Sequence, residues 1–204
     1  MDDEKVKVKI KVKEKRIMQH KGSVRLETGR LVLRRFAKGD ADAIFRNWAS
    51  DPDVTKFLTW PVHESVEASR RILDDWLLGY DKPDFYQWAI EVKSACEVIG
   101  SIGAVALDDQ IRKLDVGYCI GKGWWRMGYT SEALARLVQF FFEDVGVNRI
   151  EAYHDPRNPN SGKVMQKAGL LYEGTLRESY MCNQGVCDAA HYAILAKDYF
   201  SSGR

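Results

Sequence analysis

The sequence lacks any run of about 18 to 20 uncharged apolar residues, the length that a membrane-spanning helix needs. It also lacks the pattern of a secretory leader, because its first residues are charged and do not form a basic patch followed by an apolar stretch. We therefore expect a cytoplasmic protein that makes no contact with a membrane.

Cysteine and histidine are scarce, with four of each in the chain. Only Cys182 and Cys187 lie near each other in the sequence, and their spacing matches no usual zinc or redox motif. We expect reduced, structural cysteines and no metal site. The four histidines are expected to be structural or surface residues.

The chain does have enough apolar material for one substantial core. Of its 204 residues, 45% are hydrophobic, and they include six Trp, nine Tyr and eight Phe. This length and composition predict a single globular domain. The formal charge of +2 is unevenly distributed, because residues 1–21 hold +4 and the remainder holds −2.

The basic character is concentrated in the segment KVKVKIKVKEKR, which alternates Lys with Val or Ile. A period of two is typical of a strand with one charged face, and it suits a solvated arm equally well. We divide the chain into residues 1–24, a basic arm or an extra strand, and residues 25–204, the globular domain. For the arm, a solvated tail, an edge strand protected by lysines, a remnant of expression, and attachment to the ribosome or RNA all stay open.

The remaining sequence alternates strand and helix patterns. Strands are predicted at 30–36, 85–92, 97–107, 112–120, 148–154, 170–178 and 189–196. Helices are predicted at 40–50 and 64–78, from the glycine turn at 128 to about 146, and in a short segment closed near 169. This order predicts an α/β (α+β) chain with one mixed sheet of about seven strands and four helices.

The stretch WWRMGYTSEAL places a glycine turn directly before a strong helix pattern. The first amides of a helix have no intrahelical acceptor, and the helix dipole makes that end positive. Thr130 and Ser131 are followed three residues later by apolar residues, so no reciprocal capping box forms. An anion is the natural partner, since Gly128 lets a phosphate approach the backbone and Arg126 or Lys122 could add charge. An ordinary strand-to-helix turn is the alternative.

Four blocks of the sequence form a recognisable pattern when taken in order. They are LETGRLVLRRFAKGDADAIFRNWASDPDVTKFLTWP, LDVGYCIGKGWWRMGYTSEAL, VNRIEAYHDPRNPNSGKVMQKAGL and YEGTLRESYMCNQGVCDAAHYAIL. From about Leu26 to Ala196 the chain resembles the GNAT acetyltransferase superfamily, and within it the ribosomal-protein-alanine N-acetyltransferase (RimJ/RimL-type) branch. The resemblance implies a twisted, mostly antiparallel sheet, and it assigns residues 25–204 to an acetyl-CoA-dependent N-acetyltransferase domain.

The resemblance also implies where acetyl-CoA binds. The family's pyrophosphate loop corresponds to a run of main-chain amides at Arg126, Met127, Gly128, Tyr129, Thr130 and Ser131. The family signature Q/R-x-x-G-x-G/A is kept at Gly128, whereas Trp125 and Thr130 depart from it. In the family, pantetheine lies along a parted strand like an added strand, which places Cys119 and Ile120 nearest the thioester.

Asn158 and Ser161 match the family's N-x-x-S positions, where they would contact the cofactor arm. Both could also act only as helix caps. Many members carry a tyrosine acid at the position of Met165, which cannot donate a proton. Ser161 is therefore the candidate proton donor to the departing thiolate, with a tyrosine of the closing loop or solvent as the alternative.

The base is the least determined group. The candidates are Asp115, Glu178 and Tyr180. Asp115 and Glu178 could equally be ordinary solvated charges. A covalent intermediate on Cys119 is not favoured, because no histidine is assigned to activate it.

The acceptor is expected to be an amine that needs little help from a base. An α-amine with a pKa near 7.8 is about 14% neutral at pH 7, whereas a lysine amine near 10.4 is only about 0.04% neutral. We therefore expect the N-terminal α-amine of a protein, such as a ribosomal protein. A small amine such as a polyamine, amino acid or antibiotic, and a catalytically silent acyl-CoA-binding module, are the alternatives. The sequence leaves a monomer or a homodimer open.

Overall fold

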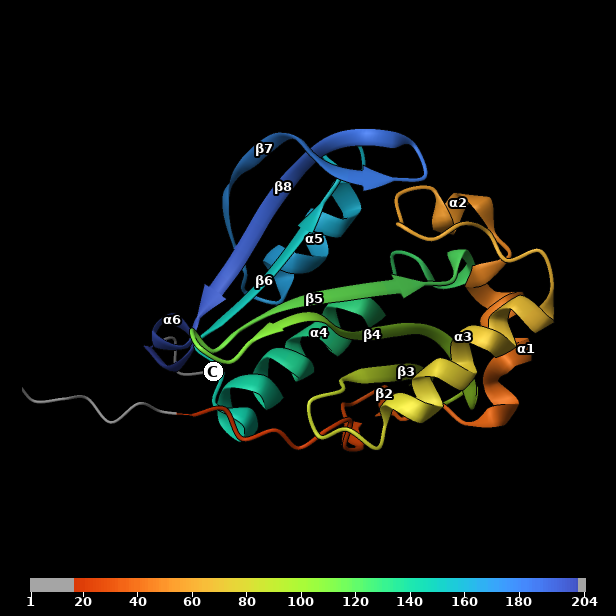
Figure 1. Ribbon diagram of the computed structural model, residues 1–204, viewed down its shortest axis with the longest axis horizontal. Helices are drawn as coiled ribbons and strands as arrows, with labels where there is room; N and C mark the ends of the chain where they lie inside the picture. The colour runs from red at the N-terminus through yellow and green to blue at the C-terminus, as the bar shows by residue number, and fades with distance from the viewer. Residues whose placement is uncertain (1–16, 202–204) are drawn as a thin grey trace, which may run out of the picture.

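The predicted strands join into one sheet. The computed structural model describes residues 17–201, and within them eight strands lie in the order β1-β2-β3-β4-β5-β6-β8-β7 (Figure 1). Their bounds are β1 Leu26–Glu27, β2 Leu31–Arg34, β3 Gln87–Val92, β4 Glu97–Asp108, β5 Lys113–Ile120, β6 Arg149–His154, β7 Leu171–Cys182 and β8 Gly185–Leu195. Only β5 and β6 are parallel, which confirms a mixed, mostly antiparallel sheet. The sequence predicted seven strands and did not predict β1. This strand has two residues and is too short to leave a periodic signal.

The part of the chain that the structure describes contains six α-helices. They are α1 Ala41–Ile44, α2 Pro52–Thr55, α3 Val66–Gly79, α4 Tyr129–Phe140, α5 Pro159–Lys167 and α6 Ala196–Ser201. α1 and α4 each continue into a turn of π-helix, at Phe45–Ala49 and Phe141–Val145, and so fill two of the predicted helices. The sequence did not predict α2 and α6. Asp51, expected only to stop a helix, accepts a 2.8 Å bond from the Asp53 amide and caps α2.

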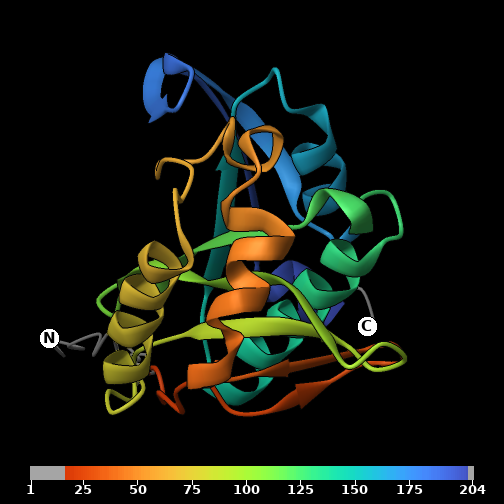
Figure 2. The same ribbon diagram turned by 90° about the vertical axis from the view of Figure 1, so that its right-hand side faces the viewer.

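Helices cover both faces of the sheet. The predicted apolar stripe of α4 is confirmed, with Leu134 and Leu137 fully buried in a cluster that includes Trp88 of β3. The next residue of β3, Ala89, belongs to a second cluster with α1 and with Leu73 of α3. Because successive strand residues point to opposite faces, α4 lies on one face and α1 and α3 lie on the other. Figure 2 shows α1 and α3 side by side.

β5 and β6 stay together over only part of their length. Their parallel register begins at Lys113 with Arg149 and ends at Asp115 with Glu151. In contrast, β4 pairs with β5 as far as Ile120. Among the described residues, β5 therefore has a strand partner on one edge only from Val116 onward, and Figure 1 shows β6 turning away from it. The predicted parting of these two strands is present.

Residues 17–24, which the sequence assigns to the arm, pack against the sheet. Met18 is buried, the Gln19 amide donates to the Val145 carbonyl at 2.8 Å, and the Ser23 hydroxyl donates to the Phe85 carbonyl at 3.1 Å. Residues 1–16, which hold most of the lysine alternation, lie outside the described residues, so the basic arm or extra strand stays a prediction. No helix within 17–201 is both long and apolar enough to cross a bilayer.

Candidate active site

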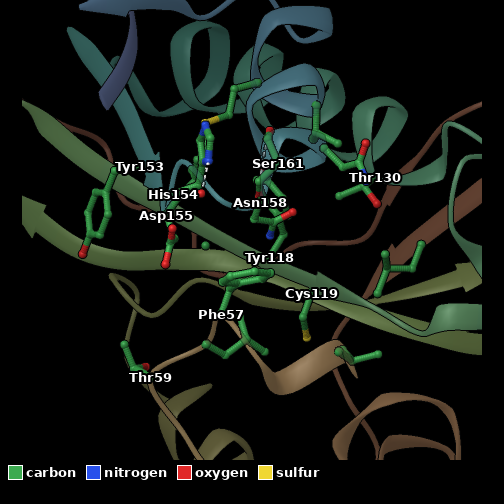
Figure 3. A pocket seen from close by; sticks show the side chains of 18 of the residues that line it. Phe57, Thr59, Tyr118, Cys119, Thr130, Tyr153, His154, Asp155, Asn158 and Ser161 are labelled. Atoms are coloured by element: carbon green, nitrogen blue, oxygen red, sulfur yellow. Dashed lines mark hydrogen bonds between the residues drawn. The ribbon is translucent and has the colours of Figure 1, made fainter. Parts of the chain in front are cut away.

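A cavity of about 510 Å³ lies where β5 separates from β6. Its walls come from the open end of β5, the end of β6, the beginning of α5, residue Thr130 of α4 and the segment 53–60 (Figure 3). This volume is in the range of about 300 to 1,000 Å³ that is typical of small-molecule sites. The parting of the two strands thus creates a concave site in the middle of the sheet.

The glycine turn before α4 adopts a left-handed conformation at two residues. Gly128 has a φ of 80° and Arg126 has a φ of 65°. Among the described residues, the main-chain amides from Met127 to Ser131 have no hydrogen-bond acceptor, and α4 has no side-chain cap. Successive free amides in such a turn form a concave anion site, and the helix dipole adds to its positive potential.

Arg30 supports this turn from the edge of the sheet. Its Nη1 donates to the Met127 carbonyl at 2.9 Å, and its Nε donates to Glu132 of α4 at 2.7 Å. Glu132 also accepts the Arg30 amide at 3.0 Å and the Thr28 hydroxyl. The guanidinium lies 4.5 Å from the centre of the Tyr129 ring. Arg30 thereby occupies the carbonyl side of the turn and leaves its amides free.

The two departures from the family signature have different surroundings. Trp125 donates its indole Nε1–H to the carbonyl of Ile120 at 2.9 Å, so it ties the turn to the end of β5. Thr130 is buried and lines the cavity. Lys122, considered as a source of positive charge for the anion, is instead paired with Asp53.

Replacing Arg30 with Met is expected to weaken acetyl-CoA binding about three- to tenfold, because each lost hydrogen bond contributes about 1 kcal/mol. The binding constant is measured by isothermal titration. Arg25→Met is the matched control, since Arg25 contacts only the exposed Glu27 in this region. Equal effects of the two substitutions would remove the supporting role of Arg30.

Comparisons with known proteins agree with this geometry. The family model described as Acetyltransferase (GNAT) domain matches residues 30–171. This chain belongs to the GNAT acetyltransferase family. Members of the family use acetyl-CoA as the acetyl donor, and the GNAT enzyme described here is accordingly an N-acetyltransferase.

The relatives of this GNAT enzyme span its domain. YoaA of Bacillus subtilis (strain 168), an uncharacterized N-acetyltransferase, is 33% identical over 170 residues, which cover 83% of this chain and 96% of YoaA. The ribosomal-protein-serine acetyltransferase of Escherichia coli (strain K12) is 23% identical over 137 residues, covering 67% of this chain and 75% of that protein. A GNAT-family acetyltransferase structure from Bacillus anthracis has a TM-score of 0.76 at 23% identity and covers 85% of this chain and 99% of its own. It supports the fold.

Ser161 of this GNAT enzyme reaches into the cavity from α5 and contacts Tyr118 of β5. Its hydroxyl donates to the Tyr118 oxygen at 3.3 Å, and the Tyr118 hydroxyl donates to the Ser161 carbonyl at 3.0 Å. Burial raises the pKa of Tyr118 far above that of a free phenol, so this hydroxyl keeps its proton. The sequence analysis did not identify Tyr118 as a site residue. The available signal was its spacing of two residues from Val116 and four from Leu114, which places all three on the same face of the strand.

Asn158 also lies at the cavity, at the beginning of α5 (Figure 3). Its side chain makes no capping bond, although it occupies the N-cap position. Ser161 likewise directs its hydroxyl to Tyr118 and not to a helix amide. The alternative that these two residues serve only as caps is therefore wrong, because neither side chain bonds a helix amide.

Asp115 does not line the cavity. It lies beside Glu151 where β5 and β6 still pair, and Lys113 is 3.3 Å from its Oδ1. Burial and the neighbouring Glu151 carboxylate raise the pKa of Asp115. Burial also opposes ionisation of Glu151, but Lys113 and Arg149 outweigh it and lower the pKa of Glu151 to about 2. Asp115 is thus part of a charge cluster outside the cavity.

Glu178 and Tyr180 lie on β7 and differ in position. Glu178 is exposed, lies outside the cavity lining, and has its amide bonded to the Asp188 carboxylate at 2.9 Å. Tyr180 lines the cavity, with its ring 5.1 Å from that of Tyr153. Burial raises the pKa of Tyr180 to about 12, so its hydroxyl is protonated at neutral pH and is a poor base.

Cys119 and Ile120 line the cavity on β5, and their place beside the thioester stays a prediction. The Cys119 sulfur lies 3.3 Å from the Ser101 hydroxyl, and burial raises the pKa of the thiol. A thiol that is harder to ionise is a weaker nucleophile, which agrees with the expectation against a covalent intermediate.

Of the aromatic residues near the sheet, Trp60 lines the cavity, whereas Tyr86 and Trp88 are core residues.

Proposed function

We propose that this GNAT enzyme transfers acetyl from acetyl-CoA to an α-amine, the N-terminal amine of a protein such as a ribosomal protein. A distant relative, the ribosomal-protein-serine acetyltransferase of Escherichia coli (strain K12), supports a protein substrate by its name. The observation that carries the proposal is the kind of ionisable group that faces the cavity.

No unpaired carboxylate lines the cavity among the described residues. Asp53 is paired with Lys122, and Asp155 accepts two bonds of 3.0 Å from Arg157 Nε. The His154 ring also lines the cavity, but its Nε2 packs against Gly162 of α5, where an added Cβ would lie 2.7 Å away. Nε2 of His154 has no hydrogen-bond partner among the described residues, but it is buried against α5. A cavity without an unpaired carboxylate or an accessible imidazole nitrogen suits an amine that is already partly neutral.

The chain offers two main-chain surfaces to acetyl-CoA. The free amides from Met127 to Ser131 suit the pyrophosphate, because they combine unpaired donors with the helix dipole. The unpaired edge of β5 from Val116 to Ile120 suits the pantetheine arm, which would bind there as an added strand. When bound, acetyl-CoA supplies the thioester that the amine attacks. Cys119, Ile120, Asn158 and Ser161 line the position that this arm would occupy.

Ser161 and Tyr118 are the groups proposed to stabilise the departing thiolate. Both hydroxyls lie between β5 and α5 at the cavity. Because its pKa is far above that of a thiol, Tyr118 would exchange its bond to the Ser161 carbonyl for a hydrogen bond to the thiolate, and would not give up its proton completely. When the neutral amine is acetylated it loses one proton. This proton passes to the leaving thiolate or to solvent.

Replacing Tyr118 with Phe is expected to lower kcat about ten- to a hundredfold while leaving the KM for acetyl-CoA within about twofold, since a hydrogen bond to a charged group contributes about 1.5 to 3 kcal/mol. Release of free thiol measures the rate. Tyr172→Phe is the control, because Tyr172 is an exposed residue of β7 whose hydroxyl contacts only Thr175. An unchanged kcat in Tyr118→Phe would remove this role.

A small amine is the second candidate acceptor, because the tip of the β7–β8 hairpin is bonded to the segment 53–60 that lines the cavity. Asn183 donates from Nδ2 to the carbonyls of Thr55 and Trp60 at 2.9 and 2.7 Å. This bridge limits the space available to a large acceptor. Thiol release against peptides with a free N-terminus, the same peptides with a blocked N-terminus, and small amines separates the two. Turnover with small amines alone would overturn the protein-substrate proposal.

A further inference from the structure

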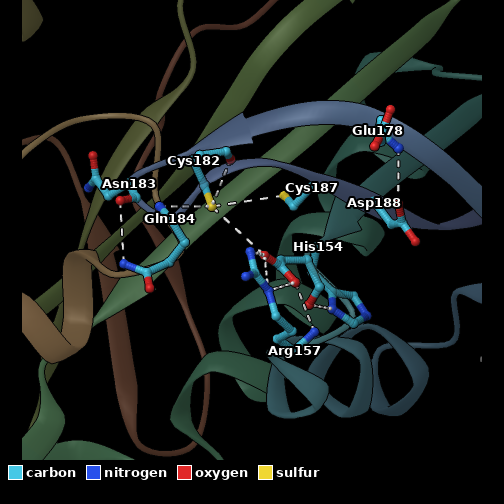
Figure 4. A network of polar contacts seen from close by, with 10 residues as sticks. His154, Arg157, Glu178, Cys182, Asn183, Gln184, Cys187 and Asp188 are labelled. Atoms are coloured by element: carbon cyan, nitrogen blue, oxygen red, sulfur yellow. Dashed lines mark hydrogen bonds and ion pairs between the residues drawn. The ribbon is translucent and has the colours of Figure 1, made fainter.

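Two cysteines near the tip of the β7–β8 hairpin and Asp155, the residue after β6, form a cluster of three buried ligand-type side chains. The sulfurs of Cys182 and Cys187 are 3.9 Å apart, and the Cys182 sulfur is 3.8 Å from Oδ2 of Asp155 (Figure 4). These residues are only 6%, 7% and 1% exposed, respectively. One ligand atom from each lies within 4.8 Å of the others. Two thiols and a carboxylate at such distances form a possible coordination set.

The strand register argues against a disulfide between the two cysteines. Cys182 is opposite Gly185 and Cys187 is opposite Tyr180, so the cysteines form a diagonal pair on one face of the hairpin. Diagonal pairs have Cα atoms about 7 to 8 Å apart, whereas disulfides need about 4.4 to 6.8 Å. Oxidation would therefore require the hairpin to distort, but shared coordination of one ion would not.

The observed distances match tetrahedral coordination. With a zinc–sulfur bond of about 2.3 Å, the sulfur–sulfur edge of a tetrahedron is about 3.8 Å, close to the 3.9 Å between the sulfurs of Cys182 and Cys187. The amide of Gln184 donates to the Cys182 sulfur at 3.4 Å, from two residues further along the turn. A hydrogen bond from a main-chain amide to a sulfur atom orients that sulfur as a ligand.

The charges around the cluster also fit a divalent cation. Arg157 binds the carboxylate of Asp155 through Nε and Nη2, and it is the one basic side chain recorded as bonded to this cluster among the described residues. Without a cation, two thiols and this ion pair have no net charge. Two thiolates, one carboxylate, one guanidinium and one divalent cation also sum to zero. Binding with release of the two thiol protons thus leaves no uncompensated buried charge.

We propose that Asp155, Cys182 and Cys187 bind one borderline-soft divalent cation of the zinc type, with water as the fourth ligand. Thiolates favour such cations over magnesium or calcium. Binding forms two metal–sulfur bonds, releases two protons and changes no oxidation state. The third ligand, Asp155, directly follows β6 and is far from the cysteines in the sequence, which explains why the cysteine spacing alone predicted no metal site.

Asn183 gives this cation a consequence for the cavity. It follows Cys182 directly and donates to the carbonyls of Thr55 and Trp60, and Trp60 lines the cavity. A cation at the hairpin tip would therefore order both the turn and the wall that it contacts.

Cobalt(II) is a suitable probe, because its thiolate complexes absorb through sulfur-to-metal charge transfer. The full chain, reduced and freed of metal with a chelator, should bind one equivalent of cobalt with this absorption, and zinc should displace it. Cys182→Ser and Cys187→Ser should each remove the absorption, and Asp155→Asn should weaken binding about tenfold or more. Cys96→Ser is the matched control, because Cys96 is exposed and lies in the β3–β4 turn. Absence of the absorption in the unmodified chain, or its persistence in the Cys182→Ser/Cys187→Ser double variant, would overturn the proposal.

A second measurement needs no variant and so does not depend on folding of the substituted chains. Zinc should slow alkylation of Cys182 and Cys187 at least about tenfold, since a coordinated thiolate is shielded, while Cys96 should react at an unchanged rate. Mass spectrometry of the digested chain reports each cysteine separately. Equal alkylation rates with and without zinc would contradict the site.

Discussion

Replacing Gly128 with Asp is expected to weaken acetyl-CoA binding about tenfold or more. Gly128 has a φ of 80°, and a Cβ at this position would lie 3.4 Å from Nη2 of Arg30. A non-glycine residue in this conformation costs about 1 to 2 kcal/mol. The new carboxylate would also repel the pyrophosphate and compete for the amides that should bind it. Isothermal titration measures the affinity directly.

Gly146→Asp separates backbone strain from loss of the site. Gly146 has a φ of 79°, nearly the same as Gly128, and no atom lies within 4 Å of its added Cβ. It follows the π-helical turn after α4, at the opposite end of that helix from the glycine turn. Both variants should lose similar stability to urea, but only Gly128→Asp should lose affinity. Equal affinities in the two variants would show that the turn does not bind the cofactor.

Free α-amines are expected to react about 350 times faster than lysine side chains at pH 7 when both are equally well placed. The factor is the ratio of their neutral fractions, about 14% against about 0.04%. It applies because the carboxylates of the cavity, on Asp53 and Asp155, are paired with Lys122 and Arg157. A peptide with a free N-terminus, and the same peptide blocked at its N-terminus with one internal lysine, give the two values of kcat/KM.

The pH profile gives a sharper version of the same prediction. Since no enzyme base is invoked, kcat/KM should rise with pH and level off at the pKa of the acceptor amine. Changing the first residue of the peptide to one with a lower α-amine pKa should shift the pH profile to lower pH by the difference between the two amine pKa values. If the midpoint of the rise in kcat/KM stayed at the same pH for every acceptor, an enzyme base would control the rate, and this would contradict the account.

The alternating strands, the long helices and the glycine turn could be predicted because their signals are local. The periodic spacing of apolar residues, and the position of Gly128 before a helix pattern, can be read from short segments without the rest of the chain. The α2 helix was missed because Asp51 and Pro52 read as a stop, although the same two residues also cap and begin a helix. β1 gave no periodic signal over two residues.

The partners of the site residues could not be predicted because they come from distant parts of the chain. Arg30 contacts the turn across a separation of 97 residues. Tyr118 meets Ser161 across 43 residues. Asp115 was predicted as a candidate base from its place on the strand. The pairing of β5 with β6 instead places it beside Glu151 and outside the cavity. Such relationships depend on strand register and helix placement, which a single sequence does not specify.

A crystal structure with coenzyme A bound is the most direct test of the central claim. The account predicts pyrophosphate oxygens within about 2.7 to 3.2 Å of several amides between Met127 and Ser131. It also predicts the pantetheine arm along β5 between Val116 and Ile120, on the edge that β6 leaves open. A pyrophosphate bound elsewhere, with the amides of the turn still unpaired, would contradict the account.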